Sequence, residues 1–146
     1  MESDTTPDPA SSALRLEATL EAARAEVERH HEVIERWLTG RGPRTDLDAF
    51  ASAHTPDFTF VTPDSETLTM PHLLAVIEPA HGAAPALTIE IRNVTVVADA
   101  GTVVVATYDE HHLGPDPRDR RATVVLVRDA AAPHGLRWRH LHETWI

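Results

Sequence analysis

One long apolar stripe near the N-terminus constrains the fold more than any other feature. Between Leu16 and Trp37, apolar residues recur at alternating intervals of four and three positions, which places them on one face of a helix. The pattern predicts a helix over residues 13–39, which Gly40 ends. Such a long one-sided helix needs a broad apolar surface to cover. Its stripe consists of Leu16, Leu20, Ala23, Val27, His30, Ile34 and Trp37.

The second half of the chain can supply that surface as a sheet. After Pro85 the pattern changes to runs rich in Ile, Val and Thr, separated by short turn sequences. Such short connections join strands in opposite directions, so the C-terminal sheet should be antiparallel. The elements predicted after the first helix are a helix at 46–53, a strand at 58–61, a helix capped by Thr69, and strands at 87–97, 102–112, 121–128 and 136–145.

Length and charge restrict the class of protein. A chain of 146 residues fits one domain, which we place at residues 13–146, after a disordered tail over residues 1–12. The formal net charge is −10 and there is no basic stripe, so nucleic acid and anionic membranes are poor partners. No apolar run approaches the roughly 20 residues of a membrane span, and the N-terminus does not resemble a secretory signal. We therefore expect a cytoplasmic protein, and the abundance of Ala, Arg and Pro suggests a bacterial gene.

Three residue types are missing, and their absence removes several kinds of chemistry. Without Cys there are no disulfides, thiolate nucleophiles or Cys-type zinc sites. Without Lys there is no Schiff base and no phosphate-binding P-loop, and Gln is missing as well. What remains includes 10 His, many carboxylates and a single Tyr. This inventory favours acid–base chemistry without a cofactor.

The order of the predicted elements resembles the nuclear-transport-factor-2-like superfamily, which includes ketosteroid isomerases and SnoaL-type polyketide cyclases. The local sequences that carry the likeness run from Glu35 to Gly40, from Asp46 to Val61 and from Gly135 to Trp145. They are similar to the branch filed as domain of unknown function 4440. The resemblance implies an α+β, cone-shaped fold, with three helices of the N-terminal half packed on a curved, mostly antiparallel β-sheet around an apolar pocket. It also implies a homodimer formed through the sheet.

The same resemblance argues against ketosteroid isomerisation. The catalytic Asp of those isomerases corresponds here to Thr62, just before Pro63. Their oxyanion-binding Tyr falls near Ile34, and its partner acid falls among the residues from Thr123 to Leu126. All three functional groups are therefore absent from the expected positions.

The last strand carries the densest group of candidate residues. Regular alternation places Trp138, His140 and His142 on one face and Glu143 on the other. If the first face lines the pocket, His142 is a candidate general acid or base, because an imidazole titrates near neutral pH. A structural role in the core or in a dimer interface explains His142 equally well, and explains His140 better.

A second polar row lies on the strand at 102–112. Alternation places Tyr108, Glu110 and His112 on one face. Burial would raise the pKa of Glu110 and make it a useful acid or base, with Tyr108 beside it. The alternative is a water-exposed rim of the sheet, on which Glu110 pairs with Arg121. A β-bulge in either strand would exchange its two faces.

Metal binding is a third interpretation of the histidines. His140 and His142 form an H-x-H pair, to which Glu110 or His112 would add a third ligand. The longer cupin pattern is missing, however. We therefore expect no metal.

Two functions remain open from the sequence. The first is a cofactor-independent isomerase, cyclase or hydro-lyase that acts on an apolar, polyketide-like compound. The second is a dimeric module that binds a ligand or a partner protein without catalysis. An open pocket with inward titratable groups would favour the first, and a filled pocket the second. The first hypothesis assigns catalysis to His142, Glu110 and Tyr108, and ligand contacts to Trp37, His30, Trp138, His140 and His112.

Overall fold

The computed structural model describes residues 8–146, and these form the predicted α+β class of fold. The helices are α1 (Pro9–Thr39), α2 (Asp46–Ser52) and α3 (Met70–Ile77), and a short 3-10 helix spans Glu78–Ala80. The strands are β1 (His54–Val61), β2 (Thr67–Thr69), β3 (Thr88–Asp99), β4 (Val103–Leu113), β5 (Arg118–Arg128) and β6 (Leu136–Trp145).

The first helix starts earlier than the apolar stripe predicts. Pro9 stands in its first turn, where the missing N–H would have no partner in any case. Residues 9–12 are therefore helical, Asp8 is the N-cap of this helix, and residues 1–7 of the predicted tail lie outside the described residues. Gly40 ends the helix in the left-handed conformation, with φ 74°, and its N–H donates to the Trp37 carbonyl over 3.1 Å.

The strands form one sheet in the order β2-β1-β6-β5-β4-β3. The C-terminal pairs β3–β4, β4–β5 and β5–β6 are antiparallel, as predicted, and only β1 runs parallel to its neighbour β6. The sequence did not predict β2, and it placed the start of β1 too late, at residue 58, because Pro56 was expected to end the preceding helix. Pro56 fits because it lies in the irregular stretch between His54 and Thr59, where β1 leaves regular register with β6.

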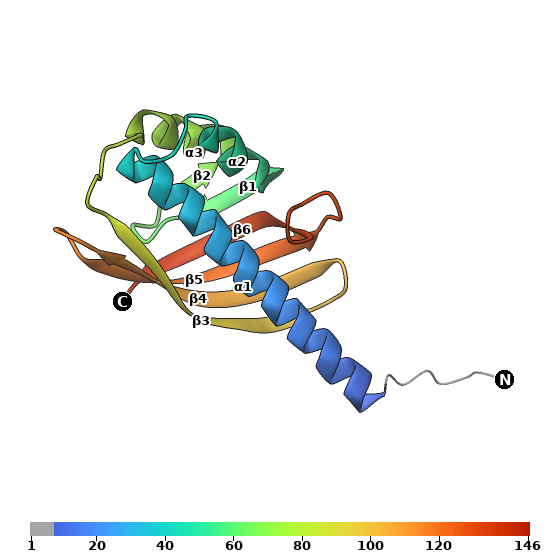
Figure 1. Cartoon of the computed structure of the whole chain (residues 1–146). Coiled ribbons are helices and arrows are strands. Elements are labelled where there is room, and N and C mark those ends of the chain that lie inside the picture. The colour runs from blue at the N-terminus through green and yellow to red at the C-terminus, as the bar shows by residue number, and fades with distance from the viewer. Residues whose placement is uncertain (1–7) are drawn as a thin grey trace.

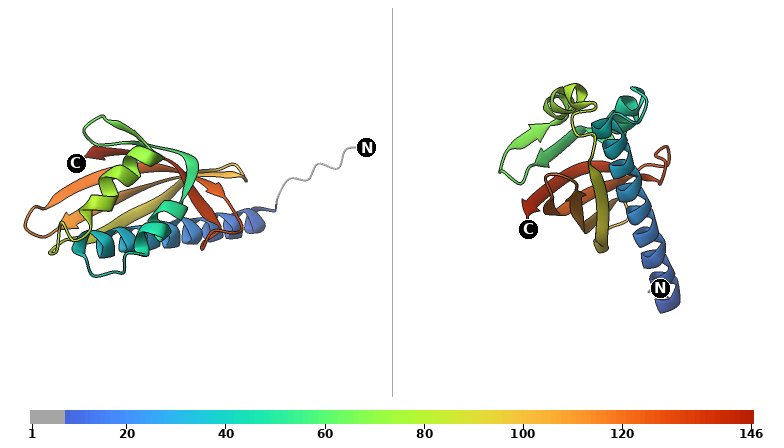
Figure 2. Two further views of the ribbon diagram at one scale, coloured as in Figure 1. Left: turned by 90° about the horizontal axis from the view of Figure 1, so that it is seen from above. Right: turned by 60° about the vertical axis from the view of Figure 1, so that its left-hand side comes forward.

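The sheet curves around α1, which crosses its concave face. Figures 1 and 2 show α1 lying diagonally over the strands, with α2 and α3 beside its C-terminal end. This arrangement confirms the expected architecture of three helices on a curved, mostly antiparallel sheet. The core lies between the apolar stripe of α1 and the inward residues of the central strands. The helix contributes Ala23 and Val27, and the strands contribute Val104, Ala106, Val124 and Leu126.

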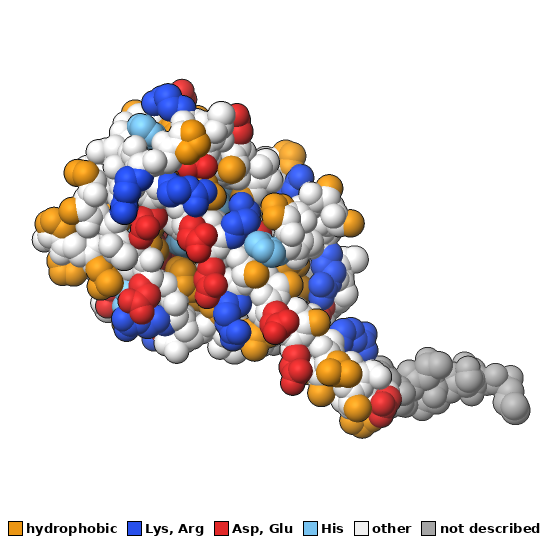
Figure 3. Space-filling view, in the orientation of Figure 1, with side chains coloured by type: hydrophobic (Ala, Val, Ile, Leu, Met, Phe, Trp, Pro, Cys, Tyr) orange, Lys and Arg blue, Asp and Glu red, His pale blue; other side chains and the backbone are white. Residues whose placement is uncertain are grey.

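The solvent side of α1 is charged. Figure 3 shows acidic and basic side chains following the diagonal of this helix across the molecule. Polar residues on one face and apolar residues on the other are what the helical periodicity predicts. Within residues 8–146, no helix is both long and apolar enough to cross a membrane.

The turn after α1 provides a test of backbone packing. A Cβ added at Gly40 would lie 3.1 Å from the Cα of Gly82, whereas one added at Gly101 would meet nothing within 4 Å. Both glycines have positive φ, so each replacement by Ala should cost about 1–2 kcal/mol from conformation alone. We expect Gly40→Ala to lower the free energy of unfolding more than Gly101→Ala, as measured by urea denaturation. Equal losses would show that the contact between Gly40 and Gly82 is unimportant.

Candidate functional site

A cavity of about 170 Å³ lies between the concave face of the sheet and the helices. Side chains from α1, α2, α3 and strands β1, β4, β5 and β6 line it. Its apolar wall includes Phe50, Phe58, Phe60, Leu73, Ile77 and Leu141. Its titratable groups are His30, His31, His54, Glu110, His112, Arg120 and Glu143. The cavity thus combines an open apolar space with inward titratable groups, the arrangement that favours the catalytic hypothesis.

Glu110 is the centre of the polar wall. One carboxylate oxygen, Oε1, lies 2.8 Å from Nε2 of His31 on α1. The other oxygen, Oε2, contacts Nε2 of His112 and lies 3.8 Å from Nε of Arg120. Strand β4 positions Glu110 and His112 on the same face, and β5 brings Arg120 directly opposite Glu110. Three cationic or potentially cationic side chains therefore surround one buried carboxylate.

His31 and Glu110 form a buried ion pair. Nδ1 of His31 lies 2.7 Å from the Val27 carbonyl, which can only accept, so this nitrogen carries a proton. Burial opposes the charge of His31, but the Glu110 carboxylate and its hydrogen bond raise the pKa of the imidazole. Burial alone would also raise the pKa of Glu110, but the charge of His31 and the hydrogen bonds from both histidines hold it well below its usual value. Of the two alternatives that the sequence left open, burial is the one observed, but the neighbouring charges and hydrogen bonds outweigh the rise in pKa that burial alone would cause.

Glu143 is the acid with the raised pKa. Burial is the main cause, the negative charge of Glu110 adds to it, and together they raise the pKa of Glu143 to about 8 despite the opposing charge of Arg120. Nη1 of Arg120 lies 3.6 Å from Oε1 of Glu143. At neutral pH the cavity therefore holds one ionised carboxylate and one protonated carboxyl.

Two further histidines of the cavity are neutral. Burial lowers the pKa of His30 well below its ordinary value, and the neighbouring His54 and His31 lower it further. Burial lowers the pKa of His54 to about 4, although its Nδ1 lies 2.8 Å from the Phe50 carbonyl. His30 stacks on Phe50 at 5.2 Å, and within the described residues its Nδ1 atom has no hydrogen-bond partner. In their neutral forms these imidazoles offer proton acceptors in the lining of the cavity.

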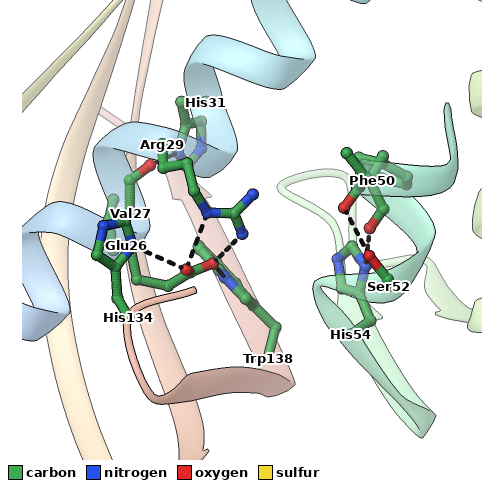
Figure 4. Close-up of polar contacts among 10 residues, drawn as sticks. Glu26, Val27, Arg29, His31, Phe50, Ser52, His54, His134 and Trp138 are labelled. Atoms are coloured by element: carbon green, nitrogen blue, oxygen red, sulfur yellow. Dashed lines mark hydrogen bonds and ion pairs between the residues drawn. The ribbon is translucent and has the colours of Figure 1, made fainter. Parts of the chain in front are cut away.

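A second buried carboxylate fixes the rear of the cavity. Figure 4 shows Glu26 on α1 between Arg29, His134 and Trp138. Arg29 donates to both oxygens of Glu26, over 3.1 and 2.7 Å, and the indole N–H of Trp138 donates to Oε2 over 2.8 Å. His134 lies farther away, with its Nδ1 at 3.4 Å. The network ties α1 to β6 and thereby fixes the orientation of Trp138, which is fully buried.

A β-bulge overturns the predicted faces of the last strand. Val125 pairs with His140 but the next residue, Leu126, pairs with Trp138, so Arg139 is an extra residue in β6. Trp138 and Glu143 consequently both face the interior, while His140 and His142 lie on the outer face. His142 is exposed, and His140 contacts the Thr59 hydroxyl with its Nδ1 at 2.7 Å. The structure therefore does not bring His142 into the cavity.

The other predicted site residues have mixed positions. Tyr108, Glu110 and His112 share the inner face of β4 as predicted, with the Tyr108 hydroxyl buried and unpartnered among residues 8–146. Trp37 lies outside the cavity lining, where its indole N–H donates to the Ile77 carbonyl over 2.7 Å. Arg121, the predicted partner of Glu110, instead binds Asp109 at 2.9 Å.

Sequence reasoning missed His31, His54, Arg120 and Glu143. His31 stands four positions after Val27, so widening the apolar stripe of α1 by one position would have included it. Arg120 could have been found from the short loop after β4, which sets it opposite Glu110. Nothing local distinguishes Glu143 from an outward-facing residue, because its facing depends on the bulge.

The metal interpretation loses its geometric basis. His140 and His142 lie on the outer face, and Glu110 and His112 lie on the inner face, so these four side chains do not meet. In the part of the chain that the structure describes, no group of three His, Asp or Glu side chains is arranged to hold a metal ion.

Comparison with known proteins identifies the family. Residues 31–144 match the model of the SnoaL-like domain, and the chain therefore belongs to this family, within the nuclear-transport-factor-2-like superfamily. The finer placement in domain of unknown function 4440 stays a prediction. A comparison with curated proteins found no significant match.

Solved structures agree with this assignment. An NTF-2-like protein of unknown function from Pseudomonas aeruginosa is 32% identical, with a TM-score of 0.81 over 86% of this chain and 98% of that one. Two more distant structures share the fold. ActVI-ORFA from Streptomyces coelicolor is 22% identical, with a TM-score of 0.60 over 84% of this chain and 96% of that one. The CaMKII hub of S. rosetta is 18% identical, with a TM-score of 0.67 over 97% of this chain and 100% of that one.

The raised pKa of Glu143 predicts a characteristic pH dependence of stability. Its pKa is about 8 in the folded protein and near 4.5 in the unfolded chain, so the folded state holds the proton more tightly. The stability that this proton contributes is complete below pH 4.5 and is lost as the pH rises toward 8. Relative to the wild type, Glu143→Gln should therefore gain stability steadily over this range, measured by urea unfolding at several pH values. A constant difference would contradict the assignment.

Proposed function

We propose that the protein binds a small, largely apolar carbonyl compound in the cavity and catalyses proton transfer on it without a cofactor. The reaction class is that of an isomerase, cyclase or hydro-lyase. The observation that carries the proposal is the pair of neighbouring carboxyl groups, Glu110 ionised and Glu143 protonated, in the polar wall of an apolar cavity.

Glu143 is the proposed general acid and base. A catalytic acid works best when its pKa lies near the operating pH, because it must both give up and recover the proton. Burial and the charge of Glu110 bring Glu143 into that range. Two carboxyl groups whose environments push their pKa values apart are a recurring sign of divided acid and base roles.

Glu110 acts through Glu143 in this proposal. Both of its oxygens are occupied by His31 and His112, so it is poorly placed to take a proton from a ligand, but its charge keeps the neighbouring carboxyl protonated. His31, His112 and Arg120 hold the Glu110 carboxylate in place. The sequence assigned catalysis to Glu110 directly, whereas the geometry supports an electrostatic and positioning role.

The neutral imidazoles supply an acceptor for the proton that leaves the carbon beside the carbonyl. When Glu143 donates its proton to a carbonyl oxygen, the carbon–hydrogen bond beside that carbonyl becomes easier to break. His30 lines the same cavity with an unpartnered nitrogen and takes this proton, which leaves an enol. Return of a proton to a different carbon isomerises the compound. Two proteins of the same fold are named as a ketosteroid isomerase and a ketosteroid isomerase-like protein, which is consistent with this class of reaction.

Exchange of the α-protons of cyclohexanone for deuterium tests the proposal. The ring is of a size suited to the cavity, since an apolar cavity of about 150 Å³ binds benzene. We expect the protein to accelerate exchange in D₂O, followed by NMR, and Glu143→Gln to reduce the acceleration roughly 100-fold or more. The activity should fall as the pH rises through about 8, because the acid form of Glu143 is lost.

Two variants sharpen this test. Glu110→Gln removes the negative charge beside Glu143, so the fall in activity should move to lower pH. His142→Ala changes an exposed residue on the outer face and should leave the exchange rate unchanged. Full activity of Glu143→Gln would exclude it as the acid. Binding of cyclohexanone without accelerated exchange would favour a ligand-binding module that performs no catalysis.

The outer face of the sheet supports a second role, assembly into a homodimer. Val103, Val105, Val125 and Val127 face away from α1 and remain partly exposed in the single chain. Partly exposed valines side by side on neighbouring strands form a surface suited to a second copy of the sheet. The similarity to the CaMKII hub of S. rosetta, and to a protein named as a calcium/calmodulin-dependent protein kinase type II association domain, is consistent with such a role.

Charge on this face should abolish the proposed dimer. Val125→Asp places a carboxylate among the outward valines of the central strands, and burying it against a partner would be costly. We expect the wild type to sediment as a dimer in analytical ultracentrifugation and the variant as a folded monomer. Val97→Asp, at an exposed position of β3, is the control and should remain dimeric. A monomeric wild type would refute the assembly.

A further inference from the structure

A second, larger space borders the cavity. A groove of about 460 Å³ lies beside it on the surface. Leu38, at the end of α1, and His112, at the end of β4, line both spaces. The rest of the groove comes from residues 83–87 on one side and from Leu113 and Pro115 on the other.

The walls of this groove are held in place by backbone contacts. The N–H of Ala84 donates to the Leu38 carbonyl over 2.8 Å, which ties residues 83–87 to the end of α1. On the opposite wall, Gly114 has φ 135°, and a Cβ added there would lie only 2.9 Å from the Ala86 carbonyl oxygen. The loop after β4 therefore packs directly on the segment before β3, which gives the groove a fixed floor.

Size indicates that the two spaces serve one ligand. Pockets for drug-sized molecules usually measure roughly 300–1,000 Å³, and the inner cavity, at about 170 Å³, holds only a compact group. The groove is the neighbouring space that shares lining residues, Leu38 and His112, with the cavity, and a larger compound that extends past them would enter it.

The lining of the groove specifies the chemistry of that extension. Ala, Pro and Leu side chains dominate, and Leu113 is 42% exposed although it is a large apolar residue. The only carboxylate among the lining residues is Asp116, which would repel an anionic end. Of the partners of Glu110, His31 and Arg120 line only the inner cavity, and His112 lies at the boundary between the two spaces.

We propose that the groove binds an uncharged apolar tail of the ligand, while its compact carbonyl-bearing head occupies the inner cavity. This inference rests on the proposed function, because it assumes that the head binds beside Glu143. It narrows the ligand to a ring or similar compact head that carries a hydrocarbon extension. Leu38 and His112 then form the passage between head and tail.

A series of 4-alkylcyclohexanones tests the two parts separately. Cyclohexanone and its 4-propyl, 4-pentyl and 4-heptyl derivatives share one head and differ only in the tail. We expect the dissociation constant, measured by isothermal titration calorimetry, to fall about twofold to fourfold for each methylene until the groove is filled. In the same samples, deuterium exchange of the α-protons measures whether the carbonyl-bearing head is bound beside Glu143.

Variants of the groove localise the tail. Leu113→Glu and Ala86→Glu place charge on exposed positions of the groove, so each should remove the dependence on tail length and leave the affinity for cyclohexanone unchanged. Val97→Glu, an exposed apolar residue of β3, is the matched control and should keep the dependence.

The outcomes separate the two proposals. If cyclohexanone binds and its tail length has no effect, the groove proposal is wrong and the proposed function stands. If the length dependence survives in both groove variants, the tail lies elsewhere and the proposal is again wrong. If no member of the series binds at millimolar concentration, the inner cavity does not accept this head, and both proposals fail.

Discussion

The buried hydrogen bond between Trp138 and Glu26 joins the first helix to the last strand, and the rest of the site depends on it. Glu26 has no exposed surface, so its charge requires the two donors of Arg29 and the indole N–H to replace water. Because these bonds fix α1 against β6, His31 on the same helix meets Glu110 on β4. The packing of this tryptophan therefore helps to hold α1 where its histidine meets the carboxylate on the sheet.

The ionised carboxylate in the cavity is balanced by the cationic side chains around it. Glu110 is ionised because His31, His112 and Arg120 surround it, and Glu143 stays protonated because a second negative charge would be placed next to the first in an apolar environment. The apolar wall strengthens both effects, since it excludes water that would screen them. The cavity can act as an acid because the pKa values of its two carboxyl groups are pushed in opposite directions, and the charge of Glu110 contributes to the shift of Glu143.

The two polar strands show how far sequence reasoning reaches. Along β4 the pairing with β5 is regular, so alternation correctly placed Tyr108, Glu110 and His112 on one face. Along β6 one extra residue, Arg139, exchanges the faces, and the prediction for His142 and Glu143 was inverted. A bulge depends on how a strand must bend to follow its neighbours around the helix, and this requirement leaves no local mark on the sequence.

The sequence by itself determined the order and type of the elements apart from the short strand β2, the long one-sided helix, and an inventory of side chains suited to acid–base chemistry. These features follow from local periodicity, from turn residues and from composition. Only the tertiary structure decided which side chains share the cavity and which of them carry protons. The reason is physical: the pKa of a buried group depends on burial and on neighbouring charges, and the neighbours of Glu110 and Glu143 come from strands and a helix far apart in the chain.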